Sequence, residues 1–194
     1  MDGISTDQIS LAVQNCLWSE TPSLHDRVTL PTFWLRVILV NYLPNFFLVG
    51  AVKAGTTAFH NMLSQHPEIY MAPIKEPNFF SQPDLQPNLY TDQYRRSVSF
   101  DLSRYLKGTM HQIIHIADVQ SWDDYHLLFK NVRNERAIGE GSNSYLYCSG
   151  VAQRIAKALP HAKIIMILRN PIERAWSHYL MNRKLGYSVR PDFL

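Results

Sequence analysis

The fold follows from one stretch, Phe47-Leu-Val-Gly-Ala-Val-Lys-Ala-Gly-Thr-Thr57. The apolar run Phe46–Val49 lies between the turn signal Pro44-Asn45 and Gly50. A short, continuous apolar run bounded in this way predicts a strand that is buried on both faces. A strand that leads through a glycine-containing loop into a helix is typical of α/β proteins with a parallel sheet.

A helix is expected directly after this loop. Thr56 or Thr57 can cap it, because threonine is a favoured N-cap residue. His66-Pro67 is expected to end it, since the residue before a proline avoids the helical conformation. The apolar residues at helical spacing are expected to form one buried stripe: Ala58, Phe59, Met62 and Leu63.

The loop Gly50–Thr57 has the features of an anion site. Its position puts backbone N–H groups and the positive end of a helix against a bound anion. Gly55 allows an unusual backbone conformation, and the ammonium of Lys53 can approach charge that develops during group transfer. The two glycines match the nucleotide-triphosphate loop GxxxxGK[ST], but Thr56 stands where that motif has lysine. We therefore expect a different kind of phosphate loop, the alternative being a plain strand-to-helix turn.

A second strand–loop–helix unit lies near the C-terminus. Lys163–Leu168 predicts a continuous apolar strand, and Asn170-Pro171 predicts a helix start with Asn as N-cap. The helix before this strand is expected to be capped by Ser149, with apolar residues four apart: Val151, Ile155 and Leu159. Such alternation predicts an α/β fold with a P-loop-like parallel sheet and helices on both faces, in three α/β/α layers.

Arg169 and Ser177 are placed to complete the anion site. Arg169 follows the strand at its carboxyl end, where open α/β sheets bind ligands, and a guanidinium can hold a phosphate through two hydrogen bonds. Ser177 falls to one side of the stripe that the next helix is expected to bury: Ile172, Ala175, Trp176, Tyr179 and Leu180. The alternatives are a surface salt bridge for Arg169 and an ordinary helix serine.

The remaining segments give weaker patterns. Residues 1–30 are expected to be a lead-in with a short helix near Ile9–Trp18, followed by one domain over 31–194. Pro73–Tyr94 is rich in proline and predicts a long loop. Residues 95–134 predict helix in several pieces, one of them beginning at Ser121.

The amino-acid composition and net charge limit the classes of protein to which the chain can belong. With 46% hydrophobic and 18% charged residues the chain is an ordinary globular protein. A net charge of +3 suits an anionic small-molecule ligand and is too weak to predict nucleic-acid binding. Cys16 and Cys148 make no disulfide framework, which favours a reducing, cytoplasmic compartment. Polar residues interrupt Leu30–Val49, so no membrane span is predicted.

Taken together, separate blocks resemble the family of sulfotransferases that use 3′-phosphoadenosine 5′-phosphosulfate (PAPS). Val49–Thr57, followed by His66-Pro67 and Lys75-Glu-Pro-Asn-Phe-Phe80, resembles the first cofactor signature. The blocks are most similar to those of the bacterial type of sulfotransferase, which is related to heparan sulfate sulfotransferase domains. Ile167–Tyr179 resembles the second signature, and Gly139–Tyr147 resembles a looser third block.

The resemblance implies roles for particular residues. Arg169 and Ser177 would hold the 3′-phosphate, and Glu76 would be the base that removes the acceptor's proton, unless it is only a surface glutamate. Lys53 would assist departure of the phosphate leaving group. The loop residues would grip the 5′-phosphosulfate: Lys53, Ala54, Gly55, Thr56 and Thr57. Val52 replaces the family's usual proline, which should alter loop stiffness more than chemistry. No metal is expected.

Several alternatives stay open. The expected function is sulfuryl transfer from PAPS to a hydroxyl or amine of a small molecule or carbohydrate. Family members usually continue well past the second signature, so we expect the C-terminal portion of the domain to be missing. An inactive module that binds PAPS or its product is therefore the alternative, and a small-molecule P-loop kinase is a weaker one. His111 and His115 have zinc-ligand spacing but lack the motif glutamate and a third ligand. Glu140 is either structural or a polar group of the cleft.

Overall fold

The structure is a computed structural model, and it describes residues 42–188. The predicted lead-in 1–30, its helix near Ile9–Trp18 and the expected domain start at residue 31 lie outside the described residues. The strands are β1 (Phe46–Leu48), β2 (Ile69–Met71), β3 (Ile74–Glu76), β4 (Ile114–Ile116), β5 (Ala137–Gly141) and β6 (Lys163–Ile165). The helices are α2 (Thr56–Leu63), α3 (Asp92–Ser97), α4 (Leu102–Lys107), α5 (Trp122–Leu127), α6 (Val151–Ala158) and α7 (Pro171–Lys184), with 3-10 turns at Phe79–Asp84, Pro87–Leu89 and Asn143–Leu146.

The central sheet has four strands in the order β2-β5-β1-β6, and every pairing is parallel. Phe47 of β1 pairs with Glu140 of β5 on one side and Ile164 of β6 on the other. Because the strands are parallel, the segments that follow β1, β5 and β6 leave the sheet at the same edge. Open α/β sheets bind their ligands at that carboxyl edge.

Helices cover both faces of this sheet. On one face Phe47 packs in the main core with Val151 and Ile155 of α6. On the other face a Cβ placed on Gly141 would meet Cβ of Leu48 at 3.6 Å and the ring of His60, in α2, at 3.7 Å. The predicted three-layer α/β/α arrangement is therefore confirmed.

Aromatic rings fix the segment after β3 to the sheet. Phe47 meets Phe80 edge-on at 5.7 Å and Tyr145 at 6.0 Å between ring centroids. Phe79 stacks on Tyr125 at 4.2 Å. Such offset and edge-on contacts add to the stabilisation from burial alone. They hold β3, and with it Glu76, against the carboxyl edge of the sheet.

A small second sheet corrects two sequence predictions. β3 and β4 pair in parallel, with Ile74 opposite Ile114 and Glu76 opposite Ile116. The segment 73–94 is therefore not one long loop, and the helical pieces predicted over 95–134 are interrupted by the strand β4. Each strand has only three residues, and its partner is far away in sequence. Local periodicity cannot detect a strand that depends on such a distant partner.

The helix starts differ in part from prediction. Gly55, at φ 100°, is the N-cap of α2, and Thr56 is already its first helical residue, so threonine does not cap it. Gly150 replaces Ser149 as N-cap of α6. Asn170 caps α7 as predicted, since its side chain accepts hydrogen bonds from the N–H groups of Ile172 and Glu173.

The buried face of α2 also differs from the predicted stripe. Its buried residues are Thr56, His60 and Leu63, whereas Ala58 is exposed. His60 is fully buried, and its Nε2 lies 3.2 Å from the Ala72 carbonyl oxygen. The hydrogen bond lets a histidine occupy a position that apolar patterning assigns only to hydrophobic side chains.

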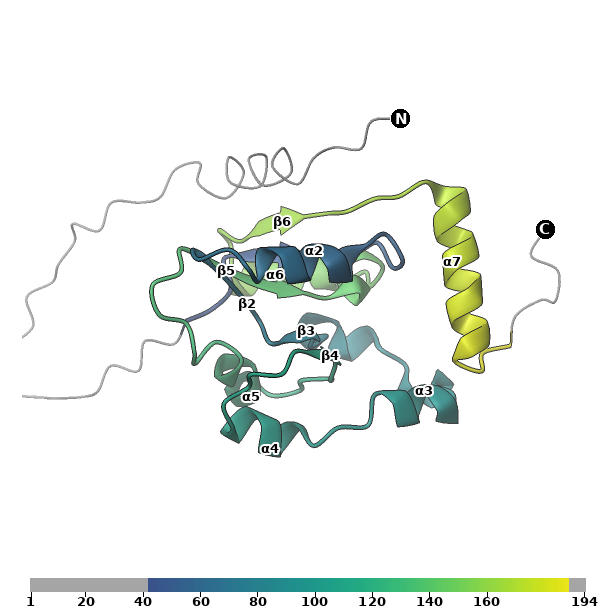
Figure 1. Ribbon diagram of the computed structural model, residues 1–194, viewed down its shortest axis with the longest axis horizontal. Helices are drawn as coiled ribbons and strands as arrows, with labels where there is room; N and C mark the ends of the chain where they lie inside the picture. Colours follow the sequence, from purple (N-terminus) through teal and green to yellow (C-terminus); the bar gives the residue numbers. More distant parts are fainter. Residues whose placement is uncertain (1–41, 189–194) are drawn as a thin grey trace, which may run out of the picture. The chain divides into compact units, whose positions relative to one another are not determined.

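β6 and α7 are more exposed to solvent than the sequence predicts. The regular strand ends at Ile165, although Ile167 continues the backbone pairing by exchanging hydrogen bonds with Gly50 and Ala51. β6 is an edge strand, and α7 has no buried residue. The predicted buried stripe of α7 is therefore wrong in the described structure, where its large members are exposed: Ile172, Trp176 and Leu180. Figure 1 shows the segment from β6 leading into α7.

None of the helices within residues 42–188 combines the length and the apolar character that crossing a membrane requires.

Candidate active site

The loop between β1 and α2 has a left-handed backbone at three positions. Gly50, Lys53 and Gly55 have φ values of 51°, 66° and 100°. A side chain at φ near +60° costs energy, so the conformation at Lys53 points to a functional constraint. A Cβ on Gly55 would meet no atom within 4 Å, so the loop is open there. The first turn of α2 contains no acidic residue, and its orphan N–H groups are suited to an anion.

Arg169 lies beside this loop. Its Nη1 is 3.5 Å from the carbonyl oxygen of Lys53, and its Nη2 is 3.0 Å from Oε2 of Glu173 one turn further on. The backbone bond from Ala51 N–H to the Ile167 carbonyl, at 2.7 Å, holds the two segments together. The two signatures, more than a hundred residues apart in sequence, thus meet at the carboxyl edge of the sheet.

Ser177 lies in the middle of α7 and is half-buried. Its neighbour His178 has a lowered pKa, first because of burial and then because of the positive charges of Arg174 and Lys53. The influence of the Lys53 charge on His178 indicates that this part of α7 lies near the phosphate loop. The contact of Ser177 with a 3′-phosphate stays a prediction.

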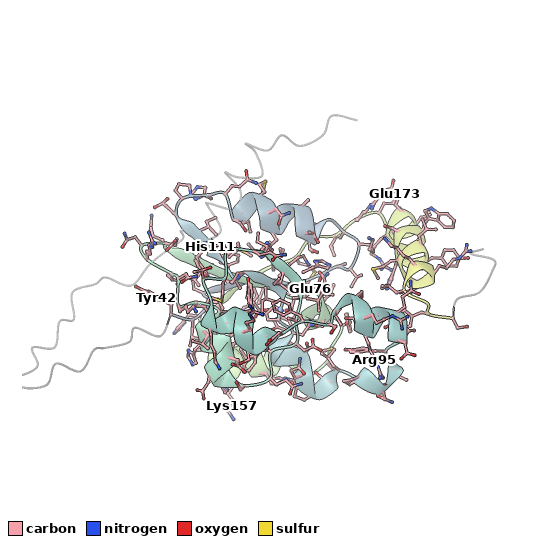
Figure 2. The ribbon with its side chains drawn as sticks, turned by 60° about the horizontal axis from the view of Figure 1, so that its bottom comes forward. Tyr42, Glu76, Arg95, His111, Lys157 and Glu173 are labelled. Atoms are coloured by element: carbon pink, nitrogen blue, oxygen red, sulfur yellow. The ribbon has the colours of Figure 1, made fainter. Side chains whose placement is uncertain are left out.

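Glu76 ends β3 with its side chain almost fully buried (Figure 2). Its Oε1 accepts hydrogen bonds from Nζ of Lys75 and from Nδ2 of Asn143, each at 2.7 Å. Lys75 has a side-chain exposure of only 2%. The carboxylate thus lies in a buried cluster with the ammonium of Lys75 and the amide of Asn143, so Glu76 is not the surface glutamate that a proline-rich loop would suggest.

Thr56 joins this group through Asn143. Its hydroxyl donates to Oδ1 of Asn143 at 3.1 Å, and the residue is buried. The hydroxyl therefore points to the protein, and a phosphate contact by Thr56 would come from its backbone N–H. Thr57, by contrast, is exposed at the start of α2.

The pKa of His115, in β4, is influenced by the charged groups of the same cluster. Partial burial of its imidazole lowers its pKa, the negative charge of Glu76 raises it, and the positive charges of Lys75 and Lys53 lower it. The pKa of His115 thus depends on the charges of both candidate catalytic residues, Lys53 and Glu76. The arrangement brings a cationic group, a carboxylate and the phosphate loop into one site.

Glu140 is structural. It is fully buried, and its carboxylate accepts hydrogen bonds from Tyr125 at 2.8 Å, Tyr145 at 3.0 Å and Ser142 at 2.7 Å. Burial raises its pKa to about 7 against the lowering effect of these hydrogen bonds. Its face of β5 is the face of Phe47, inside the core.

No group of three or more His, Cys, Asp or Glu side chains in the part of the chain that the structure describes is arranged to hold a metal ion. His111 and His115 are both exposed.

Comparison with known proteins settles the family. Residues 44–194 match the model of the Sulfotransferase family. The chain belongs to the sulfotransferase family. A sulfotransferase from Alicyclobacillus acidocaldarius has a similar crystal structure, with a TM-score of 0.60 and 39% identity over 78% of this chain and 54% of that one. The resemblance inferred from the sequence is confirmed.

Two curated relatives point to the same family. The bifunctional heparan sulfate N-deacetylase/N-sulfotransferase 2 of Homo sapiens is 29% identical over 160 residues, which cover 82% of this sulfotransferase chain and 15% of the relative. Carbohydrate sulfotransferase 15 of Mus musculus is 28% identical over 160 residues, covering 71% of this chain and 27% of the relative. The chain thus spans a minor part of the length of these relatives.

Two residues of this site were missed at the sequence level. Asn143 lies in the third block, two residues after the end of β5, and a position close to a strand's carboxyl end could have indicated a site residue. His115 was noted only for its zinc-ligand spacing from His111, because the small sheet that places it near Glu76 was not predicted. The roles of Lys53, Glu76, Arg169 and Ser177 stay predictions.

Proposed function

We propose that this chain transfers a sulfuryl group from PAPS to a hydroxyl or amine of a carbohydrate. The observation that carries the proposal is the meeting of the Lys53 loop with Arg169, 3.5 Å from the Lys53 carbonyl, beside the buried carboxylate of Glu76. Family membership supports sulfuryl transfer as the reaction class.

The residues present fit a phosphosulfate donor. The open loop at Gly55 and the non-acidic first turn of α2 can accept the 5′-phosphosulfate on backbone N–H groups. Arg169 is partly exposed and can offer its guanidinium to a phosphate. Ser177 would contribute a hydroxyl from α7. The Lys53 ammonium would balance the charge of the leaving group without a metal.

The donor supplies an activated sulfuryl group when it is bound. In the proposed step Glu76 takes the proton from the acceptor hydroxyl or amine, and the acceptor atom forms a bond to sulfur. The bond between sulfur and the bridging phosphate oxygen breaks, and that oxygen keeps the electron pair. Lys53 stabilises the negative charge that develops there. The products are the sulfated acceptor and 3′,5′-adenosine bisphosphate (PAP).

The acceptor class is proposed from the relatives. One is named for heparan sulfate and the other for carbohydrate. Both a sugar hydroxyl and a glucosamine amine meet the chemical requirement of a nucleophile with a removable proton. A carbohydrate is therefore the first class of acceptor to examine.

A transfer assay tests the proposal. The protein is incubated with ³⁵S-labelled PAPS and a panel of desulfated polysaccharides and simple alcohols, without metal. We expect label on a carbohydrate with the unaltered protein, and none with Lys53→Ala or Glu76→Gln. The control is Lys157→Ala, because Lys157 is an exposed lysine of α6 (Figure 2). Binding of PAPS without any transfer would favour the inactive module, and phosphate transfer from ATP would favour the kinase.

A further inference from the structure

Asn143 lies between the phosphate loop and Glu76. It follows β5 as the first residue of a 3-10 turn and is buried, with 8% exposure. Its Oδ1 accepts the Thr56 hydroxyl at 3.1 Å, and its Nδ2 donates to Oε1 of Glu76 at 2.7 Å. One amide therefore links the first residue of α2 to the carboxylate at the end of β3.

The chemistry of the partners fixes the orientation of this amide. An ionised carboxylate only accepts hydrogen bonds, whereas a hydroxyl donates or accepts. Turning the amide of Asn143 over would place its oxygen against Oε1 of Glu76, so that two acceptors would face each other. The Thr56 hydroxyl supports the productive orientation by donating to Oδ1. The amide is thus held with its N–H group towards Glu76.

The two carboxylate oxygens of Glu76 have different hydrogen-bonding surroundings. Oε1 receives both donors, Asn143 and Lys75. Within residues 42–188 the structure records no hydrogen bond to Oε2. A carboxylate anchored through one oxygen cannot rotate freely, and its other oxygen is left in a fixed place for the acceptor's proton.

We propose that Asn143 is a positioning residue for sulfuryl transfer, which orients Glu76 through its amide and is itself oriented by the Thr56 hydroxyl. The inference rests on the proposed function, because it assumes that Glu76 is the base. It couples the base to the same helix start that would hold the phosphosulfate. The donor and the proton acceptor thereby keep a fixed relation during the reaction.

Kinetics of two pairs of variants test the inference. Asn143→Asp keeps the acceptor for Thr56 but puts a second carboxylate against Glu76, and Asn134→Asp makes the same change at an exposed position. We expect Asn143→Asp to lower kcat roughly 10- to 100-fold, because small misplacements of a reacting group have effects of that size. The KM for PAPS and the Kd for PAP should change less than about threefold, since the phosphate contacts are kept. Asn134→Asp should behave as the unaltered protein.

The second pair of variants changes Thr56, whose hydroxyl donates to the oxygen of the Asn143 side-chain amide. Thr56→Val removes the hydroxyl and keeps the shape, and we expect a fall in kcat with little change in KM for PAPS. Thr56→Ser restores the hydroxyl and should recover most of the lost kcat. In NMR spectra of ¹⁵N-labelled protein, the side-chain amide signals of Asn143 should shift in both Thr56→Val and Glu76→Gln. If Asn143→Asp does not fold, the threonine pair and the NMR shifts decide.

The outcomes separate this inference from the proposed function. Unchanged kcat in Asn143→Asp or Thr56→Val, or a loss that follows PAP affinity or melting temperature, would overturn the positioning role alone. Full transfer by Glu76→Gln would overturn Glu76 as base, and absence of transfer by the unaltered protein would overturn the proposed function. If the side-chain amide signals of Asn143 do not shift in Glu76→Gln, the hydrogen bond between Asn143 and Glu76 is absent.

Discussion

Two buried titratable groups, Glu140 and His60, should impose opposite pH dependences on stability. Burial raises the pKa of Glu140 from 4.5 to about 7. Burial, opposed by the hydrogen bond to Ala72 and assisted by the charge of Lys75, lowers the pKa of His60 from 6.5 to about 4. Both residues have 0% exposure in the folded protein, so solvent screening weakens neither effect much.

The sign follows from which state binds the proton. Between pH 4.5 and 7 the unfolded chain has lost the Glu140 proton while the folded protein keeps it, so stability falls as pH rises, by roughly 3 kcal/mol in total. Between pH 6.5 and 4 the unfolded chain has gained the His60 proton while the folded protein has not. Stability therefore falls as pH drops, again by roughly 3 kcal/mol.

These two contributions nearly cancel in the unaltered protein between pH 4.5 and 6.5, and single variants should reveal them. Urea unfolding at pH 4.5, 5.5, 6.5 and 7.5 gives the free energy of unfolding. Relative to the unaltered protein, Glu140→Gln should gain roughly 3 kcal/mol between pH 4.5 and 7.5, and His60→Gln should lose a similar amount from pH 4.5 to 6.5. The exposed Glu173→Gln is the control. A Glu140→Gln profile parallel to that of the unaltered protein would refute the reasoning.

Three further substitutions have defined consequences. Gly139→Ala should destabilise the protein by about 1–3 kcal/mol, because its Cβ would overlap the ring of Phe46 and lie 2.6 Å from Sδ of Met71; a neutral result in urea unfolding would contradict this packing. Asn170→Ala removes the cap of α7 and should cost about 1 kcal/mol in the same experiment, and no loss would mean that the cap is unimportant. Arg169→Ala should weaken PAP binding in calorimetry roughly tenfold or more, because a charged hydrogen bond is lost; unchanged affinity would remove Arg169 from the site.

The sequence predicted those parts of the fold that local patterns determine. The run Phe46–Val49, the loop around Lys53 and the cap at Asn170 depend on neighbouring residues, and the structure places each as expected. β3 and β4 are different, because three residues carry too little pattern and their pairing joins segments about forty residues apart. α7 was misjudged since an apolar stripe predicts a buried face but not the partner that would cover it.

The candidate site shows the same division. Motif resemblance located Lys53, Arg169 and Glu76, and the structure brings them to one edge of the sheet. The hydrogen bonds of Asn143 and the burial of Lys75 depend on the exact approach of β3 to the segment after β5. No property of either residue type signals such a contact, so only the three-dimensional arrangement could show it.

We propose that the Lys53 loop and Arg169 together form a site for a phosphosulfate nucleotide. Thermal unfolding with and without PAP, in the absence of magnesium, tests it most directly, because a ligand that binds the folded state raises the melting temperature. We predict a rise with PAP for the unaltered protein and Lys157→Ala, and a much smaller one for Lys53→Ala. Stabilisation by ATP with magnesium but not by PAP would contradict the account.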